Sequence, residues 1–203
     1  FGHKALRANT TGNNNTALGR KALEVHTTGN DNTAVGTLSM LLSTTSGQNT
    51  CVGYGSGRRL TTAQRNTLIG AQVGEDITTA ENNVGVGVSS LKELTTGADN
   101  TAVGRESIQY LTTGYHNTAV GQEAMKLATT GHSNAAFGHD SLKRNTTGFV
   151  NTAIGQACGQ NITTGDNNTL IGNNAASNLT TGDNNVYLGS STQASSSNVL
   201  REY

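Results

Sequence analysis

Residues 100–116 read NTAVGRESIQYLTTGYH, and the same pattern recurs along almost the whole chain. An Asn opens each copy, and the copies follow one another every 17 residues without insertion or deletion. The eleven opening residues are Asn15, Asn32, Asn49, Asn66, Asn83, Asn100, Asn117, Asn134, Asn151, Asn168 and Asn185. A fixed period without insertions means that every unit makes the same contacts with its neighbours, which is typical of a repeat array.

Other positions of the unit are almost as regular as the Asn. A Gly follows each Asn by four residues, and the residue before that Gly is always apolar. A pair of Thr residues precedes each Asn, from Thr10-Thr11 to Thr180-Thr181. The unit therefore reads N-T-A-V-G-x-x-(S/A)-L-x-x-L-T-T-G-x-x.

The length of the unit selects the fold class. Helical repeats need about 33 residues or more and leucine-rich repeats about 20–29. Coiled coils need heptads of good helix formers, whereas Gly, Thr and Asn dominate here. We therefore predict an all-β, parallel β-solenoid of eleven 17-residue coils over residues 1–189. Strands stacked at about 4.8 Å would make a rod roughly 50 Å long.

The two ends depart from complete units. Phe1-Gly2 matches the end of a strand, so the array starts in the middle of a repeat. Residues 190–203 lose the pattern and read as a linker or as the start of a further segment. Since solenoids need capping units, we interpret the chain as a segment of a longer fibre protein.

Each unit suggests three local structures. Asn-Thr-Ala-Val-Gly predicts a short strand, ended by a Gly that needs positive φ or close backbone approach. The apolar spacing of residues 105–111 suits one helical turn, with a bent third strand as the alternative. Thr-Thr-Gly predicts a second short strand followed by a turn.

The repeated Asn has a structural explanation. Identical Asn side chains one coil apart can form a ladder of amide hydrogen bonds, as in other stacked β arrays. Such a ladder would satisfy polar groups that are buried at a corner of the coil. We prefer this interpretation to ligand binding for all eleven positions.

The strand pattern bears on the oligomeric state. Thr and Val of the strand point one way and Ala points the other, and both sides carry small or apolar residues. One side can line the interior of the coil, and the other needs the opposite wall or another chain. A parallel homotrimer is the natural closed assembly, with the Ala side at its interface, and an end-to-end polymer is the alternative.

The motif N-(S/T)-(A/V)-(V/I)-G-x-x-(S/A) resembles the repeat of trimeric autotransporter adhesin heads. The longer form T-T-G-x-x-N-T-A-V-G-x-x-A-L resembles repeats of phage long tail fibres and large surface proteins. The resemblance covers residues 1–189 and implies a trimeric β-roll in an extracellular fibre. The unit here is longer than that of the adhesin heads, with the extra residues between the Gly and the Thr pair.

Composition argues against several classes of function. The chain has 13 basic and 13 acidic residues and few aromatic residues, which disfavours nucleic-acid binding. No apolar run is long enough for a transmembrane helix, so membrane insertion is not expected. No nucleophile, phosphate-loop or metal motif is present. We therefore expect no catalytic residues, no metal and no cofactor. Glu106 and Glu123 lie one unit apart, but we interpret this spacing as a coincidence of the repeat and not as a catalytic pair of carboxylates.

Cysteine and histidine residues receive mainly structural interpretations. Cys51 and Cys158 are six units apart, too far for a disulfide, and are predicted to be buried small fillers. The histidines occupy variable positions and are predicted to lie at the surface: His3, His26, His116, His132 and His139. A weak metal or ligand site at His116 and His132 is the alternative.

The two positions before each Asn vary most and should form one exposed corner. Tyr115, His116, His132 and Phe149 cluster there in consecutive units. An exposed aromatic stripe of this kind could recognise a glycan or a protein. The alternative is tolerated surface variation, or packing at an oligomer interface.

These observations favour a structural and adhesive extracellular fibre segment, such as a tail-fibre shaft of a virion or a bacterial surface adhesin. Its expected partners are further copies of itself and a cell-surface glycan or protein receptor. The alternatives are an end-to-end extracellular filament and, because Thr residues stack in ranks, an ice-binding solenoid. An enzyme is disfavoured, since no pair of carboxylates recurs from unit to unit.

Overall fold

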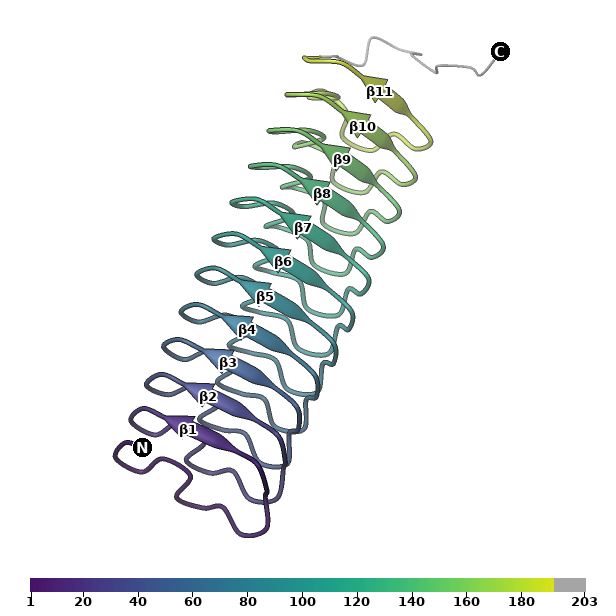
Figure 1. The fold of residues 1–203 in the computed structure, drawn as a ribbon. Coiled ribbons are helices and arrows are strands. Elements are labelled where there is room, and N and C mark those ends of the chain that lie inside the picture. The colour runs from purple at the N-terminus through teal and green to yellow at the C-terminus, as the bar shows by residue number, and fades with distance from the viewer. Residues whose placement is uncertain (192–203) are drawn as a thin grey trace.

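The computed structural model describes residues 1–191, and over this range the chain is an all-parallel β-solenoid without helices (Figure 1). The part of the predicted linker after residue 191 lies outside the described residues. Within residues 1–191 there is accordingly no helix long and apolar enough to cross a membrane. Successive coils stack into a rod with one strand per coil, all on the same side (Figure 1). The predicted all-β, parallel β-solenoid is therefore confirmed.

The eleven strands pair in chain order and form one parallel sheet. Each has three residues, and residues 17 apart are partners, as Ala102 is with Ala119. The strands are β1 (Thr16–Leu18), β2 (Thr33–Val35), β3 (Thr50–Val52), β4 (Thr67–Ile69), β5 (Val84–Val86), β6 (Thr101–Val103), β7 (Thr118–Val120), β8 (Ala135–Phe137), β9 (Thr152–Ile154), β10 (Thr169–Ile171) and β11 (Val186–Leu188).

The middle residue of every strand points into the coil. Ala102 is fully buried, and it shares the core with Ile108 and Leu111 from the other walls of the coil. The Ala position is thus an interior wall, and the first and third residues of each strand face outward. The prediction that the Ala side lies at a trimer interface is wrong, because closing a coil of only 17 residues fills its interior with this side of the strand.

The segment after the strand contains no helical turn, so this prediction is wrong. Glu106 and Ile108 have left-handed backbones, with φ of 58° and 48°. The Glu106 N–H donates to Val88 in the preceding coil and the Ile108 N–H to Ala124 in the following one, both at 2.9 Å. The Ser107 N–H between them donates to the Gly104 carbonyl at 3.3 Å and closes a turn. The segment is therefore a series of turns in which other peptides bond to both neighbouring coils, whereas a helical turn would bond only within its own segment.

The Thr pair forms a bend and not the second strand that the sequence suggested. Its first member still joins the coils, since the N–H and the hydroxyl of Thr112 both donate to the carbonyl of Thr129, at 2.9 and 3.1 Å. The second member, Thr113, is exposed. Along the rod, the first Thr of each pair therefore forms a row that is hydrogen-bonded between coils, and the second Thr forms a row that is exposed.

The Gly after each strand has the geometry that the sequence predicted. At Gly104 φ is +134°, and a Cβ built there would lie 2.4 Å from the carbonyl oxygen of Gly121. Only glycine tolerates both this conformation and this approach. The repeated Gly therefore sets the turn that follows the sheet and the close stacking of adjacent coils.

Candidate functional site

Three surfaces of the rod carry distinct chemistry. The variable corner comprises the two residues that precede each ladder Asn. The strand face comprises the outward first and third residues of β1–β11. The charged flank comprises the segment between each Gly and the following Thr pair. The Asn positions lie beside the variable corner and support it.

The eleven Asn side chains form a continuous ladder. Each side-chain oxygen accepts the N–H and the amide of the Asn one coil on, for example from Asn117 to Asn100 at 3.0 and 3.1 Å. The Asn117 amide also donates to the Gly131 carbonyl at 2.9 Å. The ten links join all eleven positions, and the nine inner Asn residues are buried. The ladder holds the adjacent corner in register.

The structure brings the aromatic residues of the variable corner into one column. The rings of Tyr115 and His132 are stacked, with centroids 4.7 Å apart and planes 3° apart. His132 and Phe149 continue the column at 5.1 Å and 12°. The stack arises because these residues occupy the same position of successive coils, at a spacing close to that of the strands.

His116 joins this cluster from the neighbouring position. Its ring meets Tyr115 edge to face, with centroids 5.1 Å apart and planes at 82°. Its Nε2 lies 3.6 Å from a carboxylate oxygen of Asp99. All four aromatic and histidine residues that the sequence singled out thus lie together.

The column is a ridge and not a pocket. The faces of His132 are covered by Tyr115 and Phe149, which themselves remain 43% and 36% exposed. The same position in the preceding coil is Ala98, so the column begins at Tyr115. Such a ridge offers ring edges, a phenol hydroxyl and imidazole nitrogens to a partner surface.

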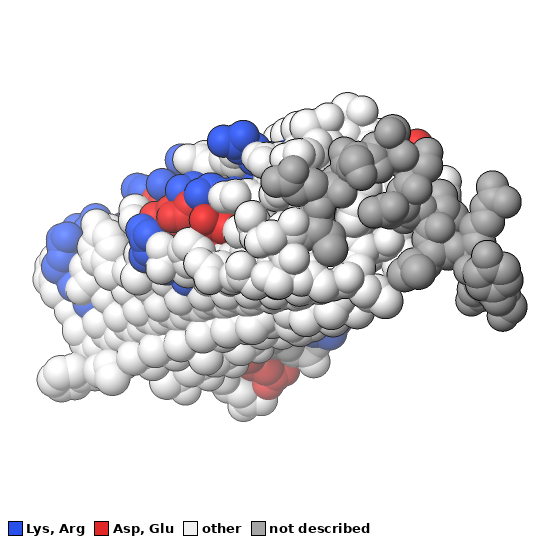
Figure 2. Space-filling model, turned by 90° about the horizontal axis from the view of Figure 1, so that it is seen from above, with Lys and Arg blue, Asp and Glu red and all other residues white. Residues whose placement is uncertain are grey.

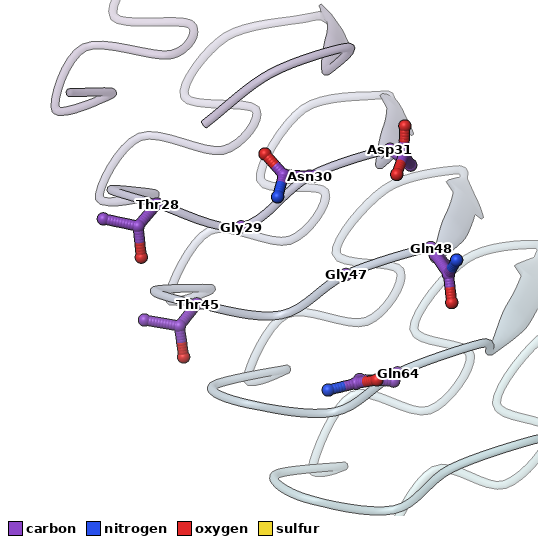
Figure 3. Close-up of a pocket in the computed structure, with 8 residues that line it drawn as sticks. All are labelled: Thr28, Gly29, Asn30, Asp31, Thr45, Gly47, Gln48 and Gln64. Carbon is purple, nitrogen blue, oxygen red and sulfur yellow. The ribbon is translucent and has the colours of Figure 1, made fainter. Parts of the chain in front are cut away.

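A hollow lies on the same corner nearer the N-terminus, at Gly47 (Figure 3). It has a volume of about 310 Å³ and is lined by polar residues of adjacent coils: Thr28, Gly29, Asn30, Asp31, Thr45, Gly47, Gln48 and Gln64. Sequence reasoning did not find this feature. The available signal was a Gly at a position that carries a side chain in the other coils.

The strand face is uncharged along the full length of the sheet, and its outward side chains are half-buried in strands such as β6 and exposed in strands such as β10. Its first row is mostly Thr, and its second row is aliphatic except for Phe137. Side chains of the second row such as Ile69, Ile154 and Leu188 are 41–53% exposed. A regular apolar surface of this kind is unusual for a monomer and often marks an interface.

Charged side chains gather on the flank, where acidic groups are bordered by basic ones (Figure 2). Glu123 lies 2.7 Å from the ammonium of Lys143 and 3.2 Å from the guanidinium of Arg105. Glu106 is paired with Lys126 at 2.6 Å and with Arg105 at 2.7 Å. Glu106 and Glu123, which the sequence places one unit apart, are thus separate members of one ion-pair network.

The network changes the ionisation of its members. The hydrogen bond from Lys143 lowers the pKa of Glu123 to about 2, assisted by the charges of Lys143 and Lys126 and opposed by partial burial. The hydrogen bond with Glu106 raises the pKa of Lys126. A carboxylate with a lowered pKa is ionised at neutral pH, which is the opposite of what a general acid requires.

One histidine prediction is wrong. His26 is fully buried, with Nδ1 3.0 Å from the hydroxyl of Ser43 and Nε2 2.9 Å from the carbonyl oxygen of Gly29. It occupies the core position held by Leu94 and Leu111 in other coils. The variability of this position reflects exchange of a core residue for a hydrogen-bonded one, which the sequence pattern alone did not distinguish from surface variation.

Both cysteines are free and buried, as predicted. Burial raises the pKa of the Cys51 thiol to about 12 and that of Cys158 to about 11. Neither thiol is therefore activated as a thiolate at neutral pH. Within residues 1–191, no group of three or more His, Cys, Asp or Glu side chains is arranged to hold a metal ion.

No protein-family model, no curated protein and no solved structure matches this chain.

Proposed function

We propose that this chain is a structural and adhesive segment of an extracellular fibre, such as a tail-fibre shaft or a surface adhesin, in which parallel copies pack through the strand face. The observation that carries the proposal is the unbroken, uncharged strand face of the eleven-stranded sheet. The resemblance of the repeat to those of adhesin heads and tail fibres supports it. The ladder-stiffened rod is suited to projecting a binding surface away from a cell or virion.

The size of the strand face is compatible with such packing. Strands of three residues span about 10 Å, and eleven of them stack to roughly 50 Å. Three such faces meeting at a common axis together cover about 1,500 Å², compared with the roughly 1,000 Å² that a specific interface needs. Parallel copies would place identical coils side by side, and three copies about a common axis form a closed assembly.

Native mass in solution tests the assembly. Light scattering should give a mass near three times 20.9 kDa. Val103→Lys places a charge in the centre of the strand face and should yield a monomer with an unchanged circular dichroism spectrum. Thr113→Lys, which adds the same charge at an exposed position away from that face, should remain trimeric.

Three results would contradict this assembly. A monomeric parent chain would remove the basis for packing through the strand face. A Val103→Lys variant that stays trimeric would place the interface elsewhere. Large polydisperse species would support the end-to-end filament instead.

We assign the adhesive role to the variable corner, where the aromatic column is exposed. An array of glycans and surface proteins should retain the labelled parent chain. The variant carrying Tyr115→Ala and Phe149→Ala should be retained less, while keeping its native mass. Equal retention of the parent chain and the variant would show that this corner does not bind the receptor.

A second candidate is ice binding, favoured by the flat strand face with its row of Thr beside a row of aliphatic side chains. Here the rigid sheet would order water through regularly spaced hydroxyl and methyl groups. Inhibition of ice recrystallisation by the parent chain, lost in Val103→Lys and kept in Thr113→Lys, would support this candidate. An inactive parent chain would dismiss it.

A further inference from the structure

The hollow in the variable corner is created by one missing side chain. Asn30 and Gln64 occupy the same position in the coils before and after Gly47, and their side chains lie on either side of it (Figure 3). Two interstrand spacings separate them, which is about 10 Å. Thr45 borders the hollow on one side and Gln48 on the other.

The backbone does not require a glycine at this place. At Gly97, in the Thr-Thr-Gly bend, a Cβ would lie 2.1 Å from the carbonyl oxygen of Gly114. At Gly47 φ lies outside the left-handed region, and a Cβ would meet only the carbonyl oxygen of Asn30, at an ordinary 3.4 Å. Because glycine destabilises a folded chain through the entropy of its unfolded state, folding does not favour it here. Its effect is to keep the hollow open.

The side chains around the hollow keep unused hydrogen-bonding groups. The Asn30 side-chain oxygen accepts an N–H of the preceding coil at 2.8 Å, which leaves its amide nitrogen to a ligand. One oxygen of Asp31 accepts an amide at 3.0 Å, and the oxygen of Gln64 accepts a guanidinium N–H at 3.1 Å. The second Asp31 oxygen, the Gln64 amide nitrogen and the side chains of Thr45 and Gln48 have no bonded partner among residues 1–191.

This mixture of groups selects a class of ligand. Amide donors, hydroxyls and one carboxylate oxygen match a ligand whose adjacent groups both donate and accept hydrogen bonds, as the hydroxyls of a sugar do. Asp31 is the single carboxylate lining the hollow, so a divalent cation would find few of the oxygen ligands that it needs. No Lys or Arg lines it, which disfavours an anion.

We propose that the hollow at Gly47 is a subsite for one neutral sugar residue of a glycan. This inference rests on the proposed adhesive function and gives it a ligand class at a place distinct from the aromatic column. An open polar hollow gives weak affinity for a single sugar, in the millimolar range. Repetition of the hollow in each copy of an assembled fibre would strengthen attachment through multivalency.

Saturation-transfer NMR on the intact chain tests the subsite. The probes are the methyl glycosides of glucose, galactose, mannose, fucose and N-acetylglucosamine, each at millimolar concentration. At least one should receive saturation from the parent protein. Gly47→Gln, which fills the hollow, should reduce that signal to the level of a non-binding reference. Thr181→Gln adds the same side chain at an exposed position outside the hollow and outside the variable corner, and it should leave the signal unchanged.

A second variant probes the chemistry of the hollow. Asp31→Asn keeps the shape and the left-handed backbone (φ 60°) but removes the negative charge. Because hydrogen bonds to charged groups contribute more than neutral ones, affinity should fall roughly tenfold. If Asp31→Asn binds the sugar with unchanged affinity, the Asp31 carboxylate does not contact the sugar, and the assignment of the groups that bind it is overturned.

The outcomes separate this inference from the proposed function. If no glycoside binds the parent chain, or if Gly47→Gln binds as well as the parent does, the subsite is overturned, whatever the native mass. A glycoside signal abolished by Ca²⁺ would also overturn it, since the hollow would then be a cation site. A monomeric mass with intact, Gly47-dependent sugar binding would instead overturn the trimeric fibre and leave the subsite standing.

Discussion

The side-chain oxygen of Asn83 accepts two hydrogen bonds from Asn100, one from its main-chain N–H at 2.9 Å and one from its side-chain amide at 3.1 Å. The two residues lie 17 positions apart in the sequence and one coil apart in space. The same relation continues along the rod, so the ladder joins every coil to the next. This buried row of amides is therefore expected to contribute strongly to the stability of the array.

Removing one member of the ladder should be costly. Asn100→Ala removes bonds of the Asn100 amide to the carbonyls of Ala98 and Gly114, and it leaves the N–H of Asn117 without its acceptor. Since a buried unsatisfied polar group costs about 1–3 kcal/mol, we expect a loss of about 3 kcal/mol or more in urea unfolding. Asn185→Ala, at the half-buried end of the ladder, should cost about 1 kcal/mol. Equally small losses in both variants would argue against a stabilising ladder.

Val150 is a β-branched residue with a left-handed backbone, at φ of 55°. Asn167 occupies the same position one coil on, at φ of 57°. Because this conformation costs a branched side chain about 1–2 kcal/mol and suits Asn, Val150→Asn should raise the unfolding free energy by about 1 kcal/mol. Asn167→Val should lower it by a similar amount. Thermal unfolding of the two variants checks the pair, and shifts in the same direction would contradict this explanation.

Asn145 is buried at a core position that holds Ala128 and Ile162 in the adjacent coils, and neither polar atom of its side chain has a hydrogen-bond partner. Leu111 occupies the equivalent position two coils earlier. Since an unpaired buried amide costs about 1–3 kcal/mol, Asn145→Leu should stabilise the chain by that order, measured by urea unfolding. Leu111→Asn should destabilise it at least as much. A destabilised Asn145→Leu variant would show that the amide is satisfied in solution, for example by a buried water.

The ion-pair network predicts a loss of stability in acid. The pKa of Glu123 falls from 4.5 to about 2 in the folded chain. A carboxyl whose folded pKa is lowered stabilises the fold above its unfolded pKa, and this contribution is lost as pH falls from about 5 towards 2. The melting temperature of the parent chain should therefore decrease over this range. Glu123→Gln should be less stable at pH 7 and should show a flatter profile below pH 5.

High salt provides a control for the acid profile. The side chains of Glu123 and Lys143 are 15% and 25% exposed, so added salt should weaken their interaction only in part. Glu93→Gln, on the same flank but outside the ion pairs of this network, should follow the parent profile. A Glu123→Gln profile as steep as that of the parent would assign the acid sensitivity to other carboxylates.

The repeat predicted the solenoid, the short strand that follows each Asn and the Gly corners, because each depends on spacing or on the conformational limits of one residue. The pattern did not predict the structure of residues 105–111. Their apolar spacing resembles a helical turn, but Glu106 and Ile108 bond to the coils on either side. Such bonds join residues 16 to 18 positions apart, and a local pattern carries no information about them.

The candidate sites divide in the same way. The sequence placed Tyr115, His132 and Phe149 at the same position of successive coils, and stacking of their rings followed directly from the period. It did not show that His26 points into the core, because this depends on which walls of the coil close upon each other. The hollow at Gly47 was also not predicted. From sequence alone, a glycine indicates only a flexible backbone, and its φ and its neighbours are needed to show that it leaves a space.

The sequence by itself determined that this protein is a stack of identical coils, because a constant period of 17 residues allows one set of contacts between neighbours. Only the tertiary structure decided which side of each strand faces water. The Thr-Ala-Val pattern carries small or apolar residues on both sides, and the choice depends on how so short a coil closes. Closure turns Ala102 into the core and leaves Thr101 and Val103 outside, and so creates the surface through which we propose that copies assemble.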